Sequence, residues 1–205
     1  EMYQRYATYI FRVVKAKMGN YLIFFPSYQF MEDVYQEFTQ LLASDEEEME
    51  LVIQQKHMDE EERENFLRAF EMGREKSLIG FGVLGGIFSE GIDLTNEKLI
   101  GTLIIGTGLP QVCNEREILK SYFDQKGLYG FDYAYRYPGM NKVLQAAGRV
   151  IRTEDDRGVI LLLDERFQRE KGKEIFPKEW ADCERCRLDI VEEKIRLFWE
   201  KQTDN

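Results

Sequence analysis

The sequence predicts an α/β domain in which helices flank a mainly parallel sheet. Short runs of consecutive apolar residues alternate along the chain with longer stretches of helical periodicity. The apolar runs lack the polar alternation of a strand with one solvated face, so they are typical of parallel strands buried on both faces. With 205 residues, the chain is long enough for one large domain, and residues 1–205 are expected to form it.

The predicted elements begin with an amphipathic helix over residues 2–17 and a strand over residues 21–25, which Pro26 and Ser27 close. The helix predicted over residues 59–72 is expected to have Asp59 as its N-cap and to end at Gly73. The remaining helical patterns cover residues 29–42, 59–72, 115–126 and 188–201. The remaining strand patterns cover residues 51–54, 78–84, 99–105 and 159–163.

Composition excludes several classes of protein. Hydrophobic residues make up 43% of the chain and aromatic residues 13%, which excludes a disordered or low-complexity chain. The longest mainly apolar stretch, residues 78–88, contains four glycines and is far shorter than the roughly 18 residues that span a bilayer, so no membrane partner is expected. Three cysteines, an odd number, argue against a disulfide framework and predict a reducing, cytoplasmic compartment.

The net charge of −10 is concentrated in one segment. Residues 45–64 hold ten carboxylates against Lys56 and Arg63, and His57 lies among them. The simplest interpretation is a solvated acidic surface, and the alternative is a face that docks a partner. The rest of the chain is nearly neutral, so a local basic groove for a nucleic acid is not excluded.

The segment that points most directly to chemistry is residues 145–152, which follows the helix-starting pair Pro138-Gly139. On a helix, Gln145, Gly148, Arg149 and Arg152 share one face. Two guanidiniums one turn apart suit a multiply charged phosphate and can stabilise charge that develops in phosphoryl transfer. The alternative is a surface helix whose arginines pair with nearby carboxylates. The opposite, core-facing side is expected to hold Val143, Leu144, Ala147, Val150 and Ile151.

Three segments in chain order resemble motifs of a known family. Residues 21–28 read YLIFFPSY and resemble motif IV, residues 85–93 read GGIFSEGID and resemble motif V, and residues 145–152 read QAAGRVIR and resemble motif VI. By these motifs the chain resembles the second motor domain of superfamily 2 helicases of the DinG and XPD type. The resemblance covers nearly the whole chain and implies a RecA-like three-layer fold, a bacterial cytoplasmic protein and 5′ to 3′ movement along DNA.

The resemblance also implies which residues serve the nucleotide. Arg149 and Arg152 would reach, as arginine fingers, the γ-phosphate of ATP held with Mg²⁺ by the first motor domain. Gln145 would support the same catalytic site. Asp93 and Glu90 of motif V would lie near the nucleotide and couple its state to the DNA groove. Besides the three catalytic residues, the resemblance implies four residues that bind the nucleotide: Gly148, Asp93, Glu90 and Gly91.

Contacts with single-stranded DNA are implied at the other two motifs. Ser27 and Tyr28 of motif IV, together with Ser89 of motif V, would touch the strand backbone through hydroxyl and main-chain groups. Tyr28 could instead serve only in packing, without touching the strand. Glu90 could likewise serve only as a helix cap, without a role at the nucleotide.

The sequence lacks the parts that would make it a complete ATPase. There is no G-x-x-x-x-G-K-[ST] phosphate loop, since Gly172-Lys173 is followed by Glu174, and there is no D-E-x-H box. The chain is therefore expected to be part of a longer helicase and to be inactive alone. The alternative functions are a catalytically silent module that binds single strands or a protein, and a stand-alone nucleotide hydrolase, which the missing phosphate loop disfavours.

Two further patterns have competing interpretations. Cys183 and Cys186 are too few for a metal site, so no metal is expected in this chain, and the resemblance places any iron–sulfur cluster in the first motor domain. The aromatic residues between positions 129 and 137 suit either base stacking or the alternation of a half-buried strand. Asp164 and Arg166 either orient the motif VI arginines or pair with one another.

Overall fold

A five-stranded parallel sheet forms the centre of the domain, which confirms the predicted α/β fold. The computed structural model describes residues 1–45, 48–71, 75–89, 99–151, 156–169 and 173–203. The strand order is β2-β3-β1-β4-β5, with every neighbouring pair parallel. The strands are β1 (Asn20–Phe25), β2 (Met49–Ile53), β3 (Ser77–Val83), β4 (Leu99–Ile105) and β5 (Val159–Leu163).

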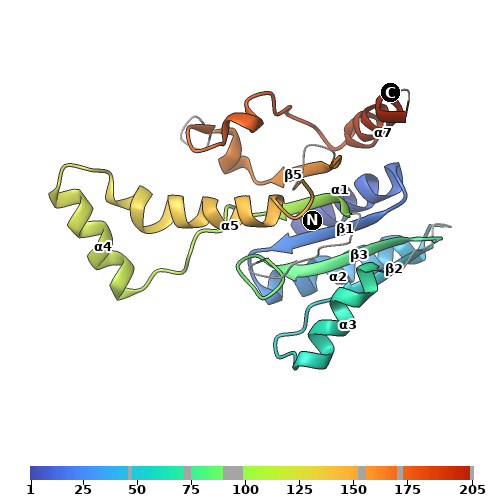
Figure 1. The fold of residues 1–205 in the computed structure, drawn as a ribbon, viewed down its shortest axis with the longest axis horizontal. Coiled ribbons are helices and arrows are strands. Elements are labelled where there is room, and N and C mark those ends of the chain that lie inside the picture. Colours follow the sequence, from blue (N-terminus) through green and yellow to red (C-terminus); the bar gives the residue numbers. More distant parts are fainter. Residues whose placement is uncertain (46–47, 72–74, 90–98, 152–155, 170–172, 204–205) are drawn as a thin grey trace.

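Helices cover both faces of this sheet (Figure 1). The α-helices are α1 (Met2–Ala16), α2 (Tyr28–Ala43), α3 (Glu60–Glu71), α4 (Asn114–Gln125), α5 (Tyr137–Ala147) and α7 (Val191–Thr203). Shorter helical segments are the π-helix η1 (Asp132–Arg136) and the 3₁₀ helices η2 (Glu165–Gln168) and η3 (Lys178–Trp180). None of the helices in the described parts of the chain is long and apolar enough to cross a bilayer.

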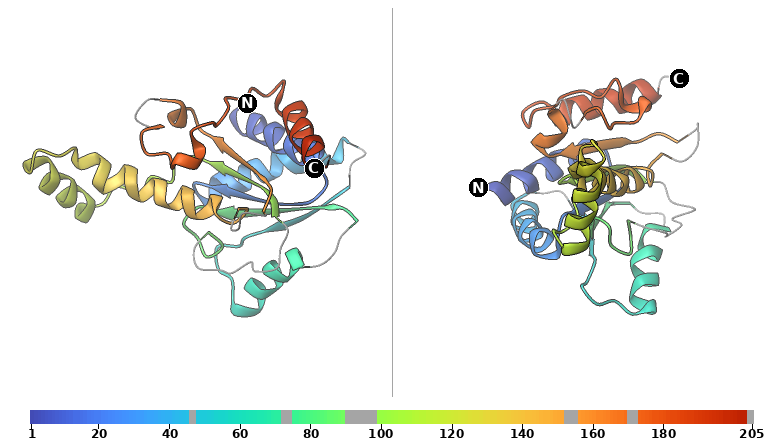
Figure 2. Two further views of the ribbon diagram at one scale, coloured as in Figure 1. Left: turned by 45° about the horizontal axis from the view of Figure 1, so that its top comes forward. Right: turned by 90° about the vertical axis from the view of Figure 1, so that its left-hand side faces the viewer.

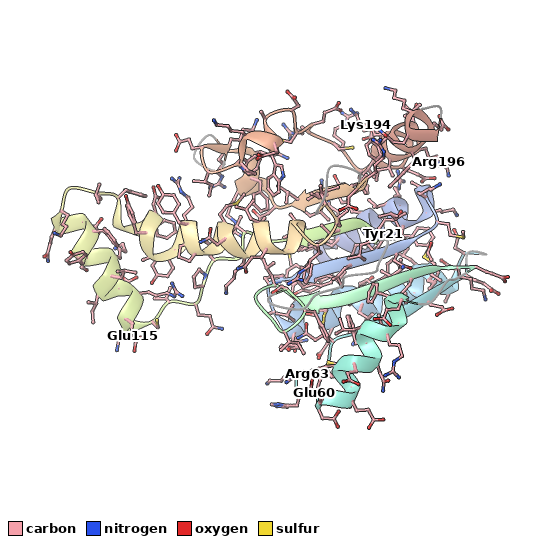
Figure 3. All side chains as sticks on the ribbon, in the orientation of Figure 1. Tyr21, Glu60, Arg63, Glu115, Lys194 and Arg196 are labelled. Atoms are coloured by element: carbon pink, nitrogen blue, oxygen red, sulfur yellow. The ribbon has the colours of Figure 1, made fainter. Side chains whose placement is uncertain are left out.

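Alternate residues of the central strand β1 supply two hydrophobic cores. Tyr21, Ile23 and Phe25 face α1, α2 and α7, whereas Leu22 and Phe24 face α3 and α5. Figure 3 shows Tyr21 within the sheet, and burial raises the pKa of its phenol above the ordinary value. The Tyr21 hydroxyl donates to the Lys17 carbonyl at 2.6 Å, which satisfies its polar end.

Local side-chain contacts fix where two of the helices begin. Ser27 is the N-cap of α2, and its hydroxyl accepts a hydrogen bond from Phe30 N at 3.2 Å. Before α3, Asp59 Oδ1 accepts from Glu62 N and Glu62 Oε2 accepts from Asp59 N, both at 2.9 Å. This reciprocal capping box confirms Asp59 as the N-cap, while the predicted stop at Gly73 lies outside the described residues.

Most of the described residues of the acidic segment lie on or near β2 and α3, at one side of the sheet. Figure 3 places Glu60 and Arg63 on the outer part of α3. His57 and Glu60 are exposed, as expected of a solvated acidic surface. Asp45 instead forms a half-buried ion pair with Lys15 of α1 at 2.9 Å.

Residues 114–137 form an arm that extends away from the sheet, as Figures 1 and 2 show from different sides. The arm contains α4, η1 and the turn between them, and α5 connects it to the sheet. No residue of α4 is buried. The helix α5 approaches the loop after β4 so closely that a Cβ added at Gly139 would lie 2.7 Å from Thr107 O.

Polar and aromatic contacts hold the two sides of the arm together. Arg116 Nη1 donates to Ala134 O at 2.7 Å, and the Tyr135 hydroxyl donates to Glu117 Oε1 at 2.6 Å. The hydrogen bond to Glu117, with burial adding to its effect, raises the pKa of Tyr135 to about 12. The arm is therefore ordered by its own contacts as well as by α5.

The strand interpretation of the aromatic residues between positions 129 and 137 is wrong, because this segment is helical. Phe131 stacks near Tyr135 with ring centroids 5.3 Å apart, and Tyr133 lies 5.2 Å from Tyr137. Two interleaved pairs, each four residues apart, produce an alternation by two that imitates a strand. Tyr133 also stacks on Phe123 of α4, with centroids 4.1 Å apart.

Candidate functional site

The carboxyl edge of the sheet brings together the described parts of the three segments that the sequence singled out. Because all strands are parallel, the segments that follow β1 and β3 emerge at the same edge. Leu84 N donates to Phe25 O at 2.8 Å, which joins the start of the turn after β3 to the end of β1. The end of α5 reaches this edge as well, since Arg149 contacts Ser89.

A glycine in a left-handed conformation shapes the turn after β3. Gly85 has φ of +76°, a conformation that other residues adopt at a cost. The turn is closed by hydrogen bonds from Gly86 N to Val83 O at 2.9 Å and from Ser89 N to Gly86 O at 3.0 Å. A Cβ added at Gly85 would lie 2.9 Å from Lys142 Nζ, so the α5 lysine covers this turn.

Ser89 is fully buried at the end of the described part of this turn. Its hydroxyl donates to Gly86 O at 2.9 Å, so in this structure the hydroxyl faces the turn and does not reach the surface. Its carbonyl accepts a hydrogen bond from Arg149 Nη2 at 3.2 Å. Ser89 therefore connects the turn after β3 to the predicted arginine finger.

The helix that carries motif VI ends earlier than predicted. It stops at Ala147 with Gly148 as C-cap, and the next two N–H groups bond to carbonyls three residues back, at 3.2 Å. This tighter winding turns Val150 into the core, where it is 5% exposed. Ile151, expected in the core, is 40% exposed, and the half-buried Arg149 lies beyond the helix instead of on its face.

The structure locates some of the predicted nucleotide-side residues and not others. Gln145 and Gly148 are exposed near the end of α5. The residues that lie outside the described parts of the chain are Arg152, Glu90, Gly91 and Asp93. The described site thus rests on Arg149, with its anchor at Ser89.

The two motif IV residues occupy the start of α2. The exposed Ser27 presents its hydroxyl at the helix N-terminus, where the first N–H groups have no partner within the helix. The half-buried Tyr28 packs against the sheet core. Its hydroxyl accepts a hydrogen bond from Gln54 Nε2 at 2.8 Å, so packing and polar contact coexist at this residue.

Sequence reasoning missed two residues of this edge, Gln54 and Lys142. Gln54 directly follows β2, is 2% exposed and accepts from Val83 N through Oε1 at 2.9 Å. Nothing in the sequence separates it from the exposed Gln55 beside it. Lys142 did carry a signal, because it lies three residues before Gln145 and shares its helix face.

Asp164 and Arg166 pair with one another. Arg166 Nε and Nη2 donate to the two Asp164 carboxylate oxygens at 2.8 and 2.6 Å. Burial alone would raise the pKa of Asp164, but these hydrogen bonds and the positive charge outweigh burial and hold it below the ordinary value. The pair also caps η2, because Arg166 N donates to Asp164 Oδ1 at 2.8 Å.

The cysteines are present as free thiols, with Cys113 and Cys183 exposed and Cys186 partly buried. Partial burial raises the pKa of the Cys186 thiol. In the described segments no three or more histidine, cysteine, aspartate or glutamate side chains are grouped so that they could hold a metal ion.

Several known helicases are similar to this chain in sequence. A probable ATP-dependent helicase of Methanocaldococcus jannaschii is 26% identical over 180 residues, which cover 80% of this chain and 27% of that protein. The XPD/RAD3 helicase subunit of the general transcription and DNA repair factor IIH of Saccharomyces cerevisiae is 28% identical, covering 83% of this chain and 22% of that protein. These relatives are archaeal and eukaryotic, so the bacterial assignment stays a prediction.

Solved structures share the fold. An XPD helicase superposes with a TM-score of 0.64 at 23% identity, over 84% of this chain and 30% of that one. The C-terminal domain of the DEAD-box protein Dbp5 superposes with a TM-score of 0.50 at 17% identity, over 93% of this chain and 90% of that one. These likenesses confirm the RecA-like architecture.

A protein-family match also covers most of the chain. The chain spans about a quarter of the length of the two sequence relatives named above. The family described as the helicase C-terminal domain matches residues 10–183, which include all three motifs. This protein belongs to the helicase C-terminal domain family.

Proposed function

We propose that this chain is the second motor domain of an ATP-dependent DNA helicase that moves 5′ to 3′ along single-stranded DNA. Membership of the helicase C-terminal domain family supports the motor role. The observation that carries the proposal is the hydrogen bond from Arg149 Nη2 to Ser89 O, 3.2 Å long, which holds a guanidinium at the carboxyl edge of the sheet. Ligands of open α/β sheets bind at that edge.

In this proposal, Arg149 acts as an arginine finger on ATP bound by the first motor domain. Its guanidinium would donate to oxygens of the γ-phosphate and stabilise the charge that develops as the terminal phosphoryl group is transferred. Arg152 would provide the second guanidinium and Gln145 would support the same site. Mg²⁺ would be held with the nucleotide by the first motor domain and would neutralise phosphate charge there.

The nucleotide-side role extends to neighbours of these residues. Gly148 would allow close approach of the phosphates, because it presents no side chain beside Arg149. Glu90, Gly91 and Asp93 would respond to the nucleotide, since they directly follow the turn that anchors Arg149.

Single-stranded DNA would be held at the start of α2. A strand phosphate would accept hydrogen bonds from the Ser27 hydroxyl and from the first backbone N–H groups of the helix, whose dipole favours an anion. Tyr28 would lie beside the same strand. Ser89 is buried, so it would contribute to strand binding indirectly, by holding the turn after β3 in place.

The decisive experiment replaces Arg149 in the complete helicase polypeptide and measures ATP hydrolysis with saturating single-stranded DNA. We expect Arg149→Ala to lower kcat by about a thousandfold or more, the scale of a lost arginine finger. Arg149→Lys should recover little of this loss, because an ammonium lacks the planar pair of donors.

Arg157→Ala provides the matched control. Arg157 is exposed, lies eight residues further along the chain and donates to Gln202 Oε1 at 2.8 Å. We expect this variant to hydrolyse ATP within about twofold of the wild type, as is usual for surface substitutions. Near wild-type turnover by Arg149→Ala would exclude the arginine-finger role.

The silent-module alternative makes a different prediction for the same proteins. A module that only binds a strand or a protein leaves ATP hydrolysis unaffected by Arg149→Ala. Strand binding through the backbone would also weaken steeply between low and moderate salt, whereas a module that docks a protein through the acidic face of residues 45–64 would not bind an oligonucleotide in this way. Measuring the affinity for an oligonucleotide as a function of salt therefore separates strand binding from protein docking.

A further inference from the structure

A continuous series of contacts joins the start of α2 to Arg149. The Tyr28 hydroxyl accepts from Gln54 Nε2 at 2.8 Å, and Gln54 Oε1 accepts from Val83 N at 2.9 Å. From Val83 the series continues through Gly86 N, which donates to Val83 O, and Ser89, which donates to Gly86 O. It ends at Ser89 O, which accepts from Arg149 Nη2.

Gln54 is the one side chain between the two ends of this series that spans separate elements. It follows β2, while its amide contacts α2 on one side and β3 on the other. Its backbone N–H also donates to Phe81 O at 2.8 Å, which fixes the residue to β3. At 2% exposure the amide is shielded from water, so these protein partners satisfy groups that burial would otherwise penalise.

Two glycines of the β3 segment leave the room that the Gln54 amide occupies. A Cβ added at Gly82 would lie 3.3 Å from Gln54 Oε1, and a Cβ added at Gly86 would lie 3.1 Å from Gln54 Nε2. The amide is therefore enclosed by backbone on the side of the turn. We therefore expect a displacement of the turn after β3 to displace the amide, and a displacement of the amide to move Tyr28.

We propose that Gln54 is a positioning residue that couples strand binding at the start of α2 to the placement of Arg149 at the nucleotide. The proposal rests on the proposed function, because it needs a strand at one end and ATP at the other. Gln54 touches neither ligand in this arrangement. It transmits a shift of Tyr28 to the turn after β3, in which the Ser89 carbonyl holds the Arg149 guanidinium.

The coupling is measured as the ratio of ATP hydrolysis at saturating single-stranded DNA to hydrolysis without DNA, in the complete helicase. Gln54→Met keeps the length of the side chain and removes both amide contacts. We expect this variant to lower the ratio by about threefold or more. Saturating DNA removes any contribution from weaker strand binding.

Tyr28→Phe tests the same link from its other end and does so without changing the buried amide. It removes only the hydroxyl that accepts from Gln54. We expect it to lower the ratio as well, and we expect the double variant to lower it no further than the larger single effect, because both changes break one link. Additive losses would overturn the proposal, as would an unchanged ratio in Tyr28→Phe.

Thr102→Val separates coupling from general loss of stability. Thr102 is fully buried on the adjacent strand β4, and its hydroxyl donates to Leu22 O at 2.8 Å, outside the series. This variant also exchanges a buried polar group for an apolar one of similar size. It should keep the ratio within about twofold of the wild type, as expected for a site with no shared partners.

Each outcome assigns success or failure to one proposal. If Arg149→Ala keeps its ATP turnover, the proposed function fails and the coupling role falls with it. If Arg149→Ala is inactive and Gln54→Met keeps the wild-type ratio while remaining folded, only the coupling role is overturned. If Gln54→Met does not fold, the Tyr28→Phe and Thr102→Val ratios decide the question.

Discussion

The sheet and the arm are held together by different kinds of contact. In the sheet, every residue of β3 is buried and both faces of β1 contribute to a hydrophobic core. In the arm, α4 buries no residue and is attached through hydrogen bonds and ring stacking. Large apolar side chains stay exposed there, among them Ile118, Tyr122 and Tyr129.

This difference separates the global stability of the domain from the local order of the arm. Contacts of the buried central strands should be lost only when the whole domain unfolds, because hydrophobic burial is shared by many elements. Contacts within the arm can be lost while the sheet stays folded, because few of them reach the core. Changes in the two regions should therefore affect different measurements.

The same substitution at one buried and one exposed isoleucine gives the largest contrast. Ile79 of β3 is fully buried, so Ile79→Ala should lower the free energy of unfolding by about 2 to 5 kcal/mol through lost burial and a residual cavity. Denaturant unfolding followed by circular dichroism measures this loss. A loss below about 1 kcal/mol would contradict the assigned core.

The N-cap of α3 tests whether the acidic helix belongs to the same cooperative unit as the sheet. Asp59→Ala removes the carboxylate that accepts from Glu62 N, which should cost about 1 kcal/mol in the same unfolding measurement. Asp59→Asn retains an acceptor oxygen and should recover most of the loss. A loss of about 1 kcal/mol in the free energy of unfolding would show that α3 unfolds together with the sheet. No change in this free energy would show that α3 unfolds separately.

Within the arm, Tyr135 gives a prediction that depends on pH. Its pKa is about 12 in the folded protein, above the ordinary value of 10, so the hydrogen bond to Glu117 stabilises the arm fully below pH 10. That contribution is lost as pH rises from 10 through about 12, because the tyrosinate can no longer donate.

Ultraviolet titration of tyrosinate absorbance checks this value. The titration curve of Tyr135→Phe, subtracted from that of the wild type, should show one group with a midpoint near 12. Tyr122→Phe is the control, because Tyr122 lies in the same arm and is 51% exposed. A midpoint near 10 for Tyr135 would show that the contact with Glu117 is absent in solution.

The smallest effect is expected at Ile118. This residue of α4 is 70% exposed, so Ile118→Ala should change the free energy of unfolding by no more than about 0.5 kcal/mol. The paired measurement with Ile79→Ala keeps the chemical change constant and varies only burial. A loss comparable to that at Ile79 would mean that the face of α4 is covered in solution.

Much of the fold was predictable because hydrophobic periodicity determines it. The strands at residues 21–25, 99–105 and 159–163 were predicted to within a residue, since buried parallel strands read as continuous apolar runs. Asp59 was predicted as an N-cap from its position before a helical pattern, and the structure adds its partner Glu62. These features depend on neighbours in the sequence.

The remaining features depend on contacts between distant segments. The aromatic residues of the arm were misread because stacking on Phe123 and the pairing of Tyr133 with Tyr137 could not be seen from spacing alone. The helix α5 ends at Ala147, so Val150 is buried as predicted while Ile151, also predicted in the core, is exposed. The burial of Gln54 could not be predicted, because nothing in the sequence distinguishes a buried glutamine from the exposed Gln55 beside it.

In the candidate site, the sequence supplied the motifs, and the structure supplied part of their geometry. Arg149 was predicted from the spacing of two arginines, and its anchor at Ser89 requires the fold to bring β3 and α5 together. Ser27 and Tyr28 were predicted from their place after β1. The hydroxyl of Tyr28 has a buried partner that only the packing of β2 against β3 could provide.

The close approach of Gly139 to the loop after β4 gives α5 a backbone contact near its N-terminal end, which would be the fulcrum of any tilt of this helix. The arm lies on one side of this contact, and the helix continues on the other side for about 14 Å to Gly148, just before Arg149. A tilt of about 10° about the fulcrum would move that end by about 2 Å, enough to break a hydrogen bond such as the one to Ser89. A tilt of α5 that moved the arm in one direction would therefore move the Arg149 guanidinium in the opposite direction.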